Sequence, residues 1–170
     1  EGHTGDFSLG DFRTERGGVI RNARLRYQVL GDRSRRAGWR LVFHALTGSA
    51  RIQDWWEPLI GPGLPLDPAD GPILSANLLG SCYGSSGPAE VSDGSFPTLT
   101  TGDLARAHLA LIGHLGIEQI ALATGGSLGG MVALQFGLLT PVPVDRLVIF
   151  AAPERTSAQA IAWNAAQRMA

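Results

Sequence analysis

The first thirty residues of the chain alternate between apolar and polar positions in short runs. In FSLGDFRTERGGVIRNARLRYQVLG, residues 7–31, these runs are interrupted at Gly17-Gly18 and at Arg21-Asn22. Alternation with a period of two is typical of strands that bury one face, and glycine and asparagine favour the turns between them. The pattern therefore predicts antiparallel strands joined by turns, followed by a charged loop at residues 31–38.

From residue 40 onward, nearly continuous apolar runs alternate with segments of helical spacing. The apolar runs predict strands that are buried on both faces. The expected strands are RLVFHAL at 40–46, PILSANLL at 72–79, QIALATG at 119–125 and RLVIFAAPE at 146–154. The expected helices are DWWEPLIG at 54–61, DLARAHLALIGHLG at 103–116, SLGGMVALQFGLLT at 127–140 and SAQAIAWNAAQRMA at 157–170. The segment 80–102 contains too many turn-forming residues for regular structure.

This order of elements predicts an α/β fold. Strands that alternate with helices form a mostly parallel sheet with helices on both faces, and the N-terminal strands add an antiparallel edge. A chain of 170 residues can bury a sizeable core and is about the size of one domain.

Composition and charge exclude several classes of partner. The chain is 44% hydrophobic and 17% charged, as expected of a globular protein, and its net charge of −1 indicates neither nucleic acid nor an anionic membrane as a partner. No apolar run reaches the roughly 20 residues needed to cross a bilayer. The single cysteine, Cys82, excludes an internal disulfide and favours a reducing, cytoplasmic compartment. No cluster of cysteine, histidine and carboxylate residues suggests a bound metal.

The most informative motif is G-x-S-x-G, which Gly125 to Gly129 form around Ser127. It lies between a predicted buried strand and a predicted helix, the context that a nucleophile elbow requires. Side chains at the two motif glycines would collide with the neighbouring strand and helix, so the serine hydroxyl can be lifted out of the sheet. The turn also places the N–H of Leu128 at the start of a helix, where it can stabilise developing negative charge.

Other interpretations of these glycines are weaker, although one stays open. A helix-entry loop whose glycines serve only packing needs no chemistry. A dinucleotide site requires G-x-G-x-x-G and an acidic residue about 20 residues further on. The glycines do not give that spacing, and Glu154 comes roughly 30 residues on. A phosphate loop requires a Gly-Lys-Ser or Gly-Lys-Thr sequence, which is absent.

The segment FHALTGSA, residues 43–50, follows the first buried strand and offers a second donor for an oxyanion. A backbone N–H near Leu46 could pair with that of Leu128. His44 is tempting as a general base, but it lies at the end of the strand, so we interpret it as a structural or loop-orienting histidine. Thr47 and Arg155, which follow predicted strand ends, are candidate substrate-binding residues; a solvated arginine is an equally good interpretation of Arg155.

Several further residues are interpreted as structural. We expect Cys82 to be a buried packing thiol rather than a nucleophile. Ser85 and Ser86 are expected to hold a tight loop beside the acyl site. The neighbouring tryptophans Trp55 and Trp56 are expected to anchor a short helix rather than to stack on a ligand. His108 and His114 fall on a helix that we expect to be peripheral, and Asp145 precedes its strand on the side away from Ser127; these residues receive no catalytic role.

Four segments together resemble the homoserine O-acetyltransferases, a family with the α/β-hydrolase fold that includes related serine and deacetylcephalosporin acetyltransferases. They are FHALTGSA, NLLGSCYGSSGPAE, GGSLGGMVALQF and RTSAQAIAWNAAQR, in the order in which the family has them. The resemblance implies that Ser127 is the acyl-accepting nucleophile and that Leu46 and Leu128 supply the oxyanion amides. It also implies ping-pong transfer from acetyl-CoA to the hydroxyl of homoserine or a similar small amino acid, and a homodimer built through a helical lid.

A serine nucleophile needs a histidine base and an acid that orients it, and this fold supplies them in the order Ser, acid, His. No histidine follows Ser127, and the acids beyond it are Asp145 and Glu154. We therefore expect residues 1–170 to be the N-terminal part of a single catalytic domain, with the lid and the last strands on a longer or second chain. Alone, this part should expose one edge and one face of its sheet.

Two other functions stay open. An esterase would use the same nucleophile and oxyanion amides with water as the acceptor. A non-catalytic fragment or pseudoenzyme that serves as an interaction subunit would explain the missing base.

Overall fold

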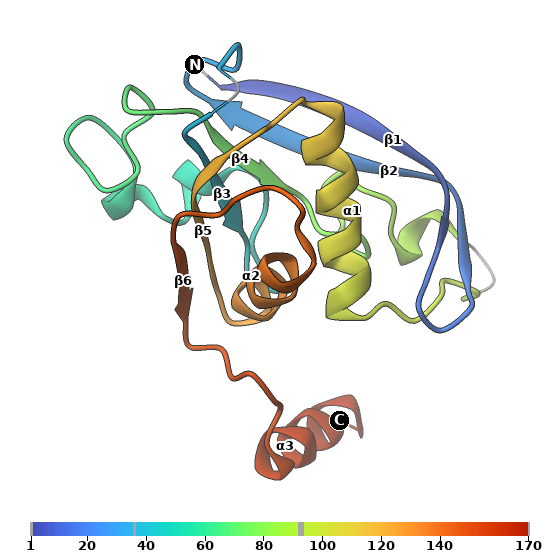
Figure 1. Ribbon diagram of the computed structural model, residues 1–170. Coiled ribbons are helices and arrows are strands. Elements are labelled where there is room, and N and C mark those ends of the chain that lie inside the picture. Colours follow the sequence, from blue (N-terminus) through green and yellow to red (C-terminus); the bar gives the residue numbers. More distant parts are fainter. Residues whose placement is uncertain (1, 36, 92–93, 170) are drawn as a thin grey trace.

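The computed structural model describes residues 2–35, 37–91 and 94–169. Within these ranges, six strands form one sheet in the order β1-β2-β4-β3-β5-β6 (Figure 1). The strands are β1 (His3–Arg13), β2 (Val19–Leu30), β3 (Trp39–Phe43), β4 (Ile73–Ala76), β5 (Ile120–Gly126) and β6 (Leu147–Phe150). The helices are α1 (Thr101–His114), α2 (Leu128–Leu139) and α3 (Ala158–Met169), and three short 3-10 helices are η1 (Ile52–Asp54), η2 (Glu57–Leu59) and η3 (Pro88–Glu90).

The antiparallel N-terminal edge is confirmed, although one predicted turn is not. β1 and β2 pair in antiparallel fashion and are joined by a tight turn at Gly17. The expected break at Arg21-Asn22 is wrong, because β2 continues through it with a shift in register. Asn22 takes a positive φ of 48°, and its N–H donates to a carboxylate oxygen of Asp11 at 3.1 Å. Asparagine tolerates this left-handed conformation, which allows a bulge inside the strand.

The other half of the sheet is parallel and fixes where a site can form. β3 pairs in parallel with β4 and with β5, and β5 pairs in parallel with β6. The carboxyl ends of these strands therefore meet along one rim. The turns after β3, β4 and β5 leave the sheet at that rim, which is where open α/β sheets bind ligands.

Two apolar clusters cover the two faces of the sheet. On one face, side chains of α1 and α2, including Leu111 and Phe136, pack against Leu41 and Phe43 of β3. On the other face, Val42 packs among residues of the segment 52–66. The short helix expected at 54–61 is replaced there by η1 and η2, because Pro58 comes only four residues after the last residue of η1, Asp54.

Helix α1 begins slightly earlier than its hydrophobic spacing indicates. Thr100 is its N-cap, and the Thr100 hydroxyl accepts from the N–H of Asp103 at 3.0 Å. The Asp103 carboxylate in turn accepts from the N–H of Thr100 and, at 2.9 Å, from the N–H of Glu15. This capping box satisfies N–H groups at the start of the helix and joins it to the turn after β1.

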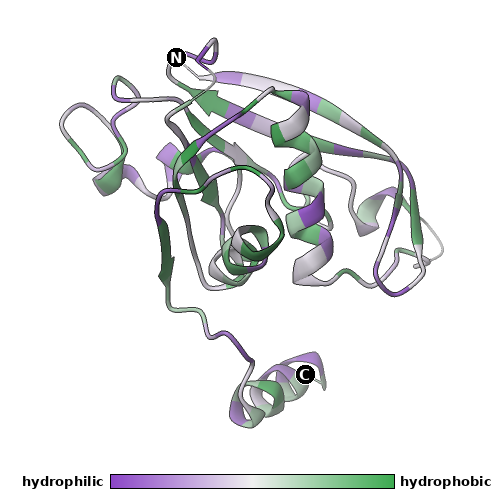
Figure 2. Cartoon of the chain, viewed as in Figure 1, coloured by the Kyte–Doolittle hydropathy of each residue, from purple (hydrophilic) through white to green (hydrophobic). Residues whose placement is uncertain are grey.

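The C-terminal elements are much less covered than the rest. Three of the four residues of β6 are exposed, and α3 has no buried residue. α3 lies apart from the sheet at the end of an extended segment (Figure 1). β6 is exposed even though it is uniformly hydrophobic (Figure 2). Trp163 of α3 is 65% exposed. The sheet therefore has a packed region up to β5 and an open region beyond it.

Candidate active site

Ser127 lies in the sharp turn between β5 and α2. Its φ of 55° and ψ of −123° place it in a conformation that non-glycine residues rarely adopt, and its side chain is exposed. Such strained backbone persists only when the surroundings enforce it, and it is concentrated at functional sites. The backbone N–H of Ser127 donates to the carbonyl of Phe150 at 3.0 Å, which ties the turn to the end of β6.

The two motif glycines on either side of Ser127 have no room for a side chain. A Cβ at Gly129 would lie 2.1 Å from the carbonyl oxygen of Phe43, and a Cβ at Gly125 would lie 2.5 Å from the backbone of Gly129. The first turn of α2 thus presses directly against the end of β3. Gly126 differs, since its nearest neighbour would be 3.9 Å away at Phe150. The outer glycines of the motif are required by sterics, as the sequence predicted.

The turn after β3 lies beside the serine turn. Leu46 is 77% exposed, and the N–H of Gly48 donates to the carbonyl of Ala45 at 2.9 Å to close the turn. A small cavity of about 110 Å³ is lined by Leu46 and by Leu128 together with His44 and residues that follow β4. Leu128 is the first residue of α2, where a backbone N–H has no partner within the helix. The structure therefore brings both predicted amide residues to one cavity.

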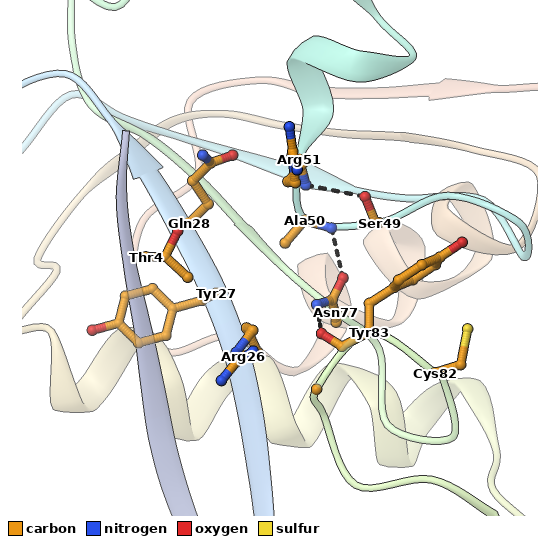
Figure 3. Close-up of a pocket in the computed structure, with 11 residues that line it drawn as sticks. Thr4, Arg26, Tyr27, Gln28, Ser49, Ala50, Arg51, Asn77, Cys82 and Tyr83 are labelled. Atoms are coloured by element: carbon orange, nitrogen blue, oxygen red, sulfur yellow. Dashed lines mark hydrogen bonds between the residues drawn. The ribbon is translucent and has the colours of Figure 1, made fainter. Parts of the chain in front are cut away.

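A buried asparagine that sequence reasoning missed holds the neighbouring loops. Asn77, which follows β4, accepts from the N–H of Ala50 at 2.6 Å and donates to the carbonyl of Tyr83 at 2.6 Å (Figure 3). The hydroxyl of Ser85 donates to the Asn77 carbonyl at 2.6 Å. The signal was present in the sequence, because Asn77 interrupts the apolar run PILSANLL. A polar residue in such a run is buried only if it finds hydrogen-bond partners.

Ser85 and Ser86 hold their loop as expected. Both are buried, and their hydroxyl groups accept from the N–H groups of Arg26 and Arg24 on β2, at 3.0 and 3.2 Å. The loop is thereby attached to β2 beyond the residues that pair with β4.

Two larger cavities lie next to this loop. One of about 470 Å³ is lined by Arg26, Asn77 and Cys82 among others, and Figure 3 shows its walls. The second, of about 410 Å³, is lined by Thr47, and both cavities share residues from the segments around Arg51 and Tyr83. Thr47 thus faces a space that is large enough for a small substrate.

Other predicted residues form no hydrogen bond with Ser127 in the described ranges. Arg155 is exposed in the loop after β6 and forms no hydrogen bond or ion pair within the part of the chain that is described. Asp145 is exposed and accepts from the side chain of Gln119 at 3.1 Å. The expectation of a buried Cys82 is wrong, because the loop around it turns the thiol toward solvent. The indole N–H of Trp55 donates to the carbonyl of Ser49 at 3.0 Å, which anchors this side chain to the turn before η1.

None of the four histidines is hydrogen-bonded to Ser127 in the described ranges. His44 is 1% exposed, and burial lowers the pKa of its side chain. The expectation that α1 is peripheral is wrong at His108, which is 2% exposed and lies 4.9 Å from the ring of Phe43. Its burial lowers the pKa of His108 to about 4. His114 is exposed and stacks on Phe7 at 4.7 Å.

The described residues hold neither a metal-binding cluster nor a membrane-spanning helix. No group of three or more histidine, cysteine or carboxylate side chains is arranged to hold a metal ion in residues 2–35, 37–91 and 94–169. In the same ranges, no helix has the length and apolar character needed to span a membrane.

The chain is similar to a family model, to curated proteins and to solved structures. Residues 41–170 match the model of the alpha/beta hydrolase fold family. The chain is 45% identical to homoserine O-acetyltransferase from Thermus thermophilus over 94% of its own length and 49% of that protein's. It superposes on homoserine O-acetyltransferase from Staphylococcus aureus with a TM-score of 0.87 and 35% identity, covering 99% of this chain and 52% of the other. It also superposes on an acetylester hydrolase from Corynebacterium glutamicum with a TM-score of 0.82 and 27% identity, over 92% and 46%. The chain spans about half the length of the relatives it matches.

Proposed function

The chain belongs to the alpha/beta hydrolase fold family, and from this premise we propose that it carries the nucleophile and the oxyanion amides of a homoserine O-acetyltransferase. The observation that carries the proposal is the strained, exposed Ser127, which lies beside the turn that follows β3. The similarity to homoserine O-acetyltransferases over nearly the whole chain supports homoserine as the acceptor. Acetyl-CoA is the proposed acyl donor, and the reaction requires no metal.

In the proposed reaction, the Ser127 oxygen attacks the thioester carbonyl of acetyl-CoA. The N–H groups of Leu46 and Leu128 stabilise the oxyanion of the tetrahedral adduct. The C–S bond then breaks, and the departing thiolate takes the proton that the serine gave up. The homoserine hydroxyl attacks the resulting acetyl ester and releases O-acetylhomoserine, and Ser127 regains its proton. Thr47 and Arg155 are proposed to contact the substrates.

The proton carrier in this scheme is proposed to come from outside residues 1–170. His44 and His108 are buried and bonded elsewhere, and in the described ranges no residue is hydrogen-bonded to the side chain of Ser127. We propose that residues 1–170 are one part of a single catalytic domain, whose acid and histidine are carried by a further segment or a second chain. The complete enzyme is proposed to be a homodimer that acts on small molecules.

The test uses the complete polypeptide that contains residues 1–170. Release of CoA from acetyl-CoA is followed with and without homoserine, and the acetylated product is identified by mass. We expect release to depend on homoserine, and Ser127→Ala to lower the rate by roughly 10⁴-fold or more. In parallel, a fluorophosphonate should label Ser127, which an intact mass and a peptide map would detect.

A second candidate function is an esterase that uses water as the acceptor. The structural likeness to an acetylester hydrolase favours it, because the same elbow would serve both reactions. Release of CoA that is indifferent to homoserine, together with cleavage of a simple acetyl ester, would establish the esterase. Failure of Ser127 to label in the complete polypeptide would instead establish the non-catalytic subunit.

A further inference from the structure

His44 follows β3 directly, and its imidazole joins two turns at the rim of the sheet. Nε2 lies 3.0 Å from the backbone nitrogen of Leu78, and Nδ1 lies 2.7 Å from the carbonyl oxygen of Ala45. A backbone N–H can only donate, so Nε2 must be the unprotonated acceptor. Nδ1 therefore carries the proton and donates it to the Ala45 carbonyl. The two contacts fix a single neutral tautomer of the ring.

The carbonyl that accepts from His44 belongs to the same peptide unit as the Leu46 N–H. A peptide unit is planar, and no cis peptide bond occurs in the described residues. In a trans unit, the C=O and the N–H point in opposite directions. The bond that holds the Ala45 oxygen toward the imidazole therefore turns the Leu46 N–H away from it. The N–H of Gly48 donates to the same oxygen at 2.9 Å and supports this orientation.

We propose that His44 is a positioning residue that aims the Leu46 N–H at the reacting carbonyl through its bond to the Ala45 oxygen. The inference rests on the proposed function, because it gives the Leu46 N–H an oxyanion to stabilise. It also explains why His44 is not the base, since its one acceptor nitrogen is occupied by Leu78. His44, Leu46 and Leu128 line the same small cavity, so the ring lies close to the amide whose direction it sets.

The surroundings of His44 keep the ring neutral. The side chain is 1% exposed, and desolvation lowers its pKa, which favours the uncharged form. The titratable group that faces it from α1 is His108, whose pKa of about 4 leaves it neutral as well. A proton added at Nε2 would set two donors against each other at the Leu78 N–H.

Two substitutions in the complete polypeptide separate the two bonds of the ring. His44→Asn places an amide N–H near the position of Nδ1, so a donor to the Ala45 carbonyl is kept. His44→Gln places an amide oxygen near the position of Nε2, so the acceptor for Leu78 is kept and the donor to Ala45 is lost. Both variants lose one of two hydrogen bonds, and their melting temperatures serve as the matched control.

We expect kcat of His44→Gln to fall by roughly 100-fold or more, the effect of losing one oxyanion donor, with KM for acetyl-CoA little changed. His44→Asn should stay within about tenfold of the native rate. The rate of Ser127 labelling by a fluorophosphonate should follow the same order, because the phosphonyl oxygen needs the same amides. Equal losses in both variants, or native rates in both, would overturn the inference while native labelling upholds the proposed function. Failure of the native enzyme to label would overturn both.

A measurement on the unsubstituted protein tests the proposal even if the variants do not fold. Long-range ¹H–¹⁵N correlation spectra of the imidazoles distinguish the two neutral tautomers and the charged ring. At pH 7 we expect His44 to be neutral with its proton on Nδ1. A proton on Nε2, whether in the other neutral tautomer or in a charged ring, would contradict the two bonds of the imidazole and overturn the proposal.

Discussion

β4 and β6 are both four-residue, mainly apolar strands of the same sheet, but β4 is buried and β6 is exposed. Every residue of Ile73–Ala76 is at most 2% exposed, with neighbouring strands on both sides and an apolar cluster on each face. In β6, Leu147 is 39%, Val148 38% and Phe150 49% exposed. Hydropathy alone cannot separate the two strands, because burial depends on what else the chain places beside them.

The open region also differs from the opposite edge of the sheet. β1 is an edge strand as well, but its exposed positions include Thr4, Asp6 and Ser8, which are suited to water. β6 presents an apolar edge, and an apolar cavity of about 270 Å³ lies between it and the segment 56–66. An exposed apolar edge favours association, whereas a polar edge does not. The difference supports the proposal that a further segment covers β6.

The serine turn lies between the packed and open regions. Substitutions at its glycines compare the packing beside β3, at Gly129, with the packing beside β6, at Gly126. Gly129→Ala would force a Cβ against the Phe43 carbonyl at 2.1 Å, a backbone atom that cannot yield easily. We expect a loss of more than about 3 kcal/mol in the free energy of unfolding. Displacement of Ser127 should lower acetyl transfer by roughly 100-fold or more. Urea unfolding and CoA release measure the two effects.

Gly126→Ala is the matched control, because its Cβ would point toward Phe150 with 3.9 Å of space. It should change the free energy of unfolding by less than about 1 kcal/mol. Equal damage from both substitutions would mean that the region beside β6 is as tightly packed as the region beside β3. The contrast between the two sides of the turn would then be wrong.

Truncation of one side chain in each strand tests the same contrast in the core. Leu74→Ala in β4 removes a side chain that is 1% exposed, and we expect a cost of about 2–5 kcal/mol. Val148→Ala in β6 removes a side chain that is 38% exposed, so we expect a loss of less than about 1 kcal/mol in the free energy of unfolding if nothing else covers β6. Chemical denaturation of both variants gives the values. In the complete polypeptide, a larger cost at Val148 would measure how well a further segment covers β6.

The order of elements was predictable from the sequence because it depends on local periodicity. The strands after residue 40, the three helices after residue 100, the serine turn and the steric need for Gly125 and Gly129 follow from such patterns, whereas the helix expected at 54–61 does not form. The exposure of Cys82 and the burial of His108 did not follow, because each depends on contacts with segments far away in the sequence. The same is true of Asn77, whose partners come from two separate loops. Local patterns therefore fix the elements, and long-range packing decides which side chains meet.

The buried His108 belongs to the packed region and makes its stability depend on pH. Its pKa is about 4 in the folded protein, against an ordinary value of 6.5 in the unfolded chain. The unfolded state therefore binds a proton first as the pH falls. The free energy of unfolding should decrease between about pH 6.5 and 4, by roughly 3 kcal/mol from this residue. His108→Leu should remove that part of the slope in urea titrations at several pH values. An unchanged slope would mean that α1 opens enough to hydrate the ring.

The smallest expected effect concerns two left-handed residues, one in each region. Asn22 has a φ of 48° in β2, and Ala151 has a φ of 46° directly after β6. Asparagine tolerates this conformation, so Asn22→Gly should be nearly neutral. Alanine does not, and Ala151 lies in the open region, where we expect Ala151→Gly to stabilise the fold by up to about 1 kcal/mol. Thermal and urea unfolding of both variants would measure the difference. If Ala151→Gly instead destabilises the complete polypeptide, the Ala151 methyl group packs against a segment beyond those described, and the open region is closed in the whole enzyme.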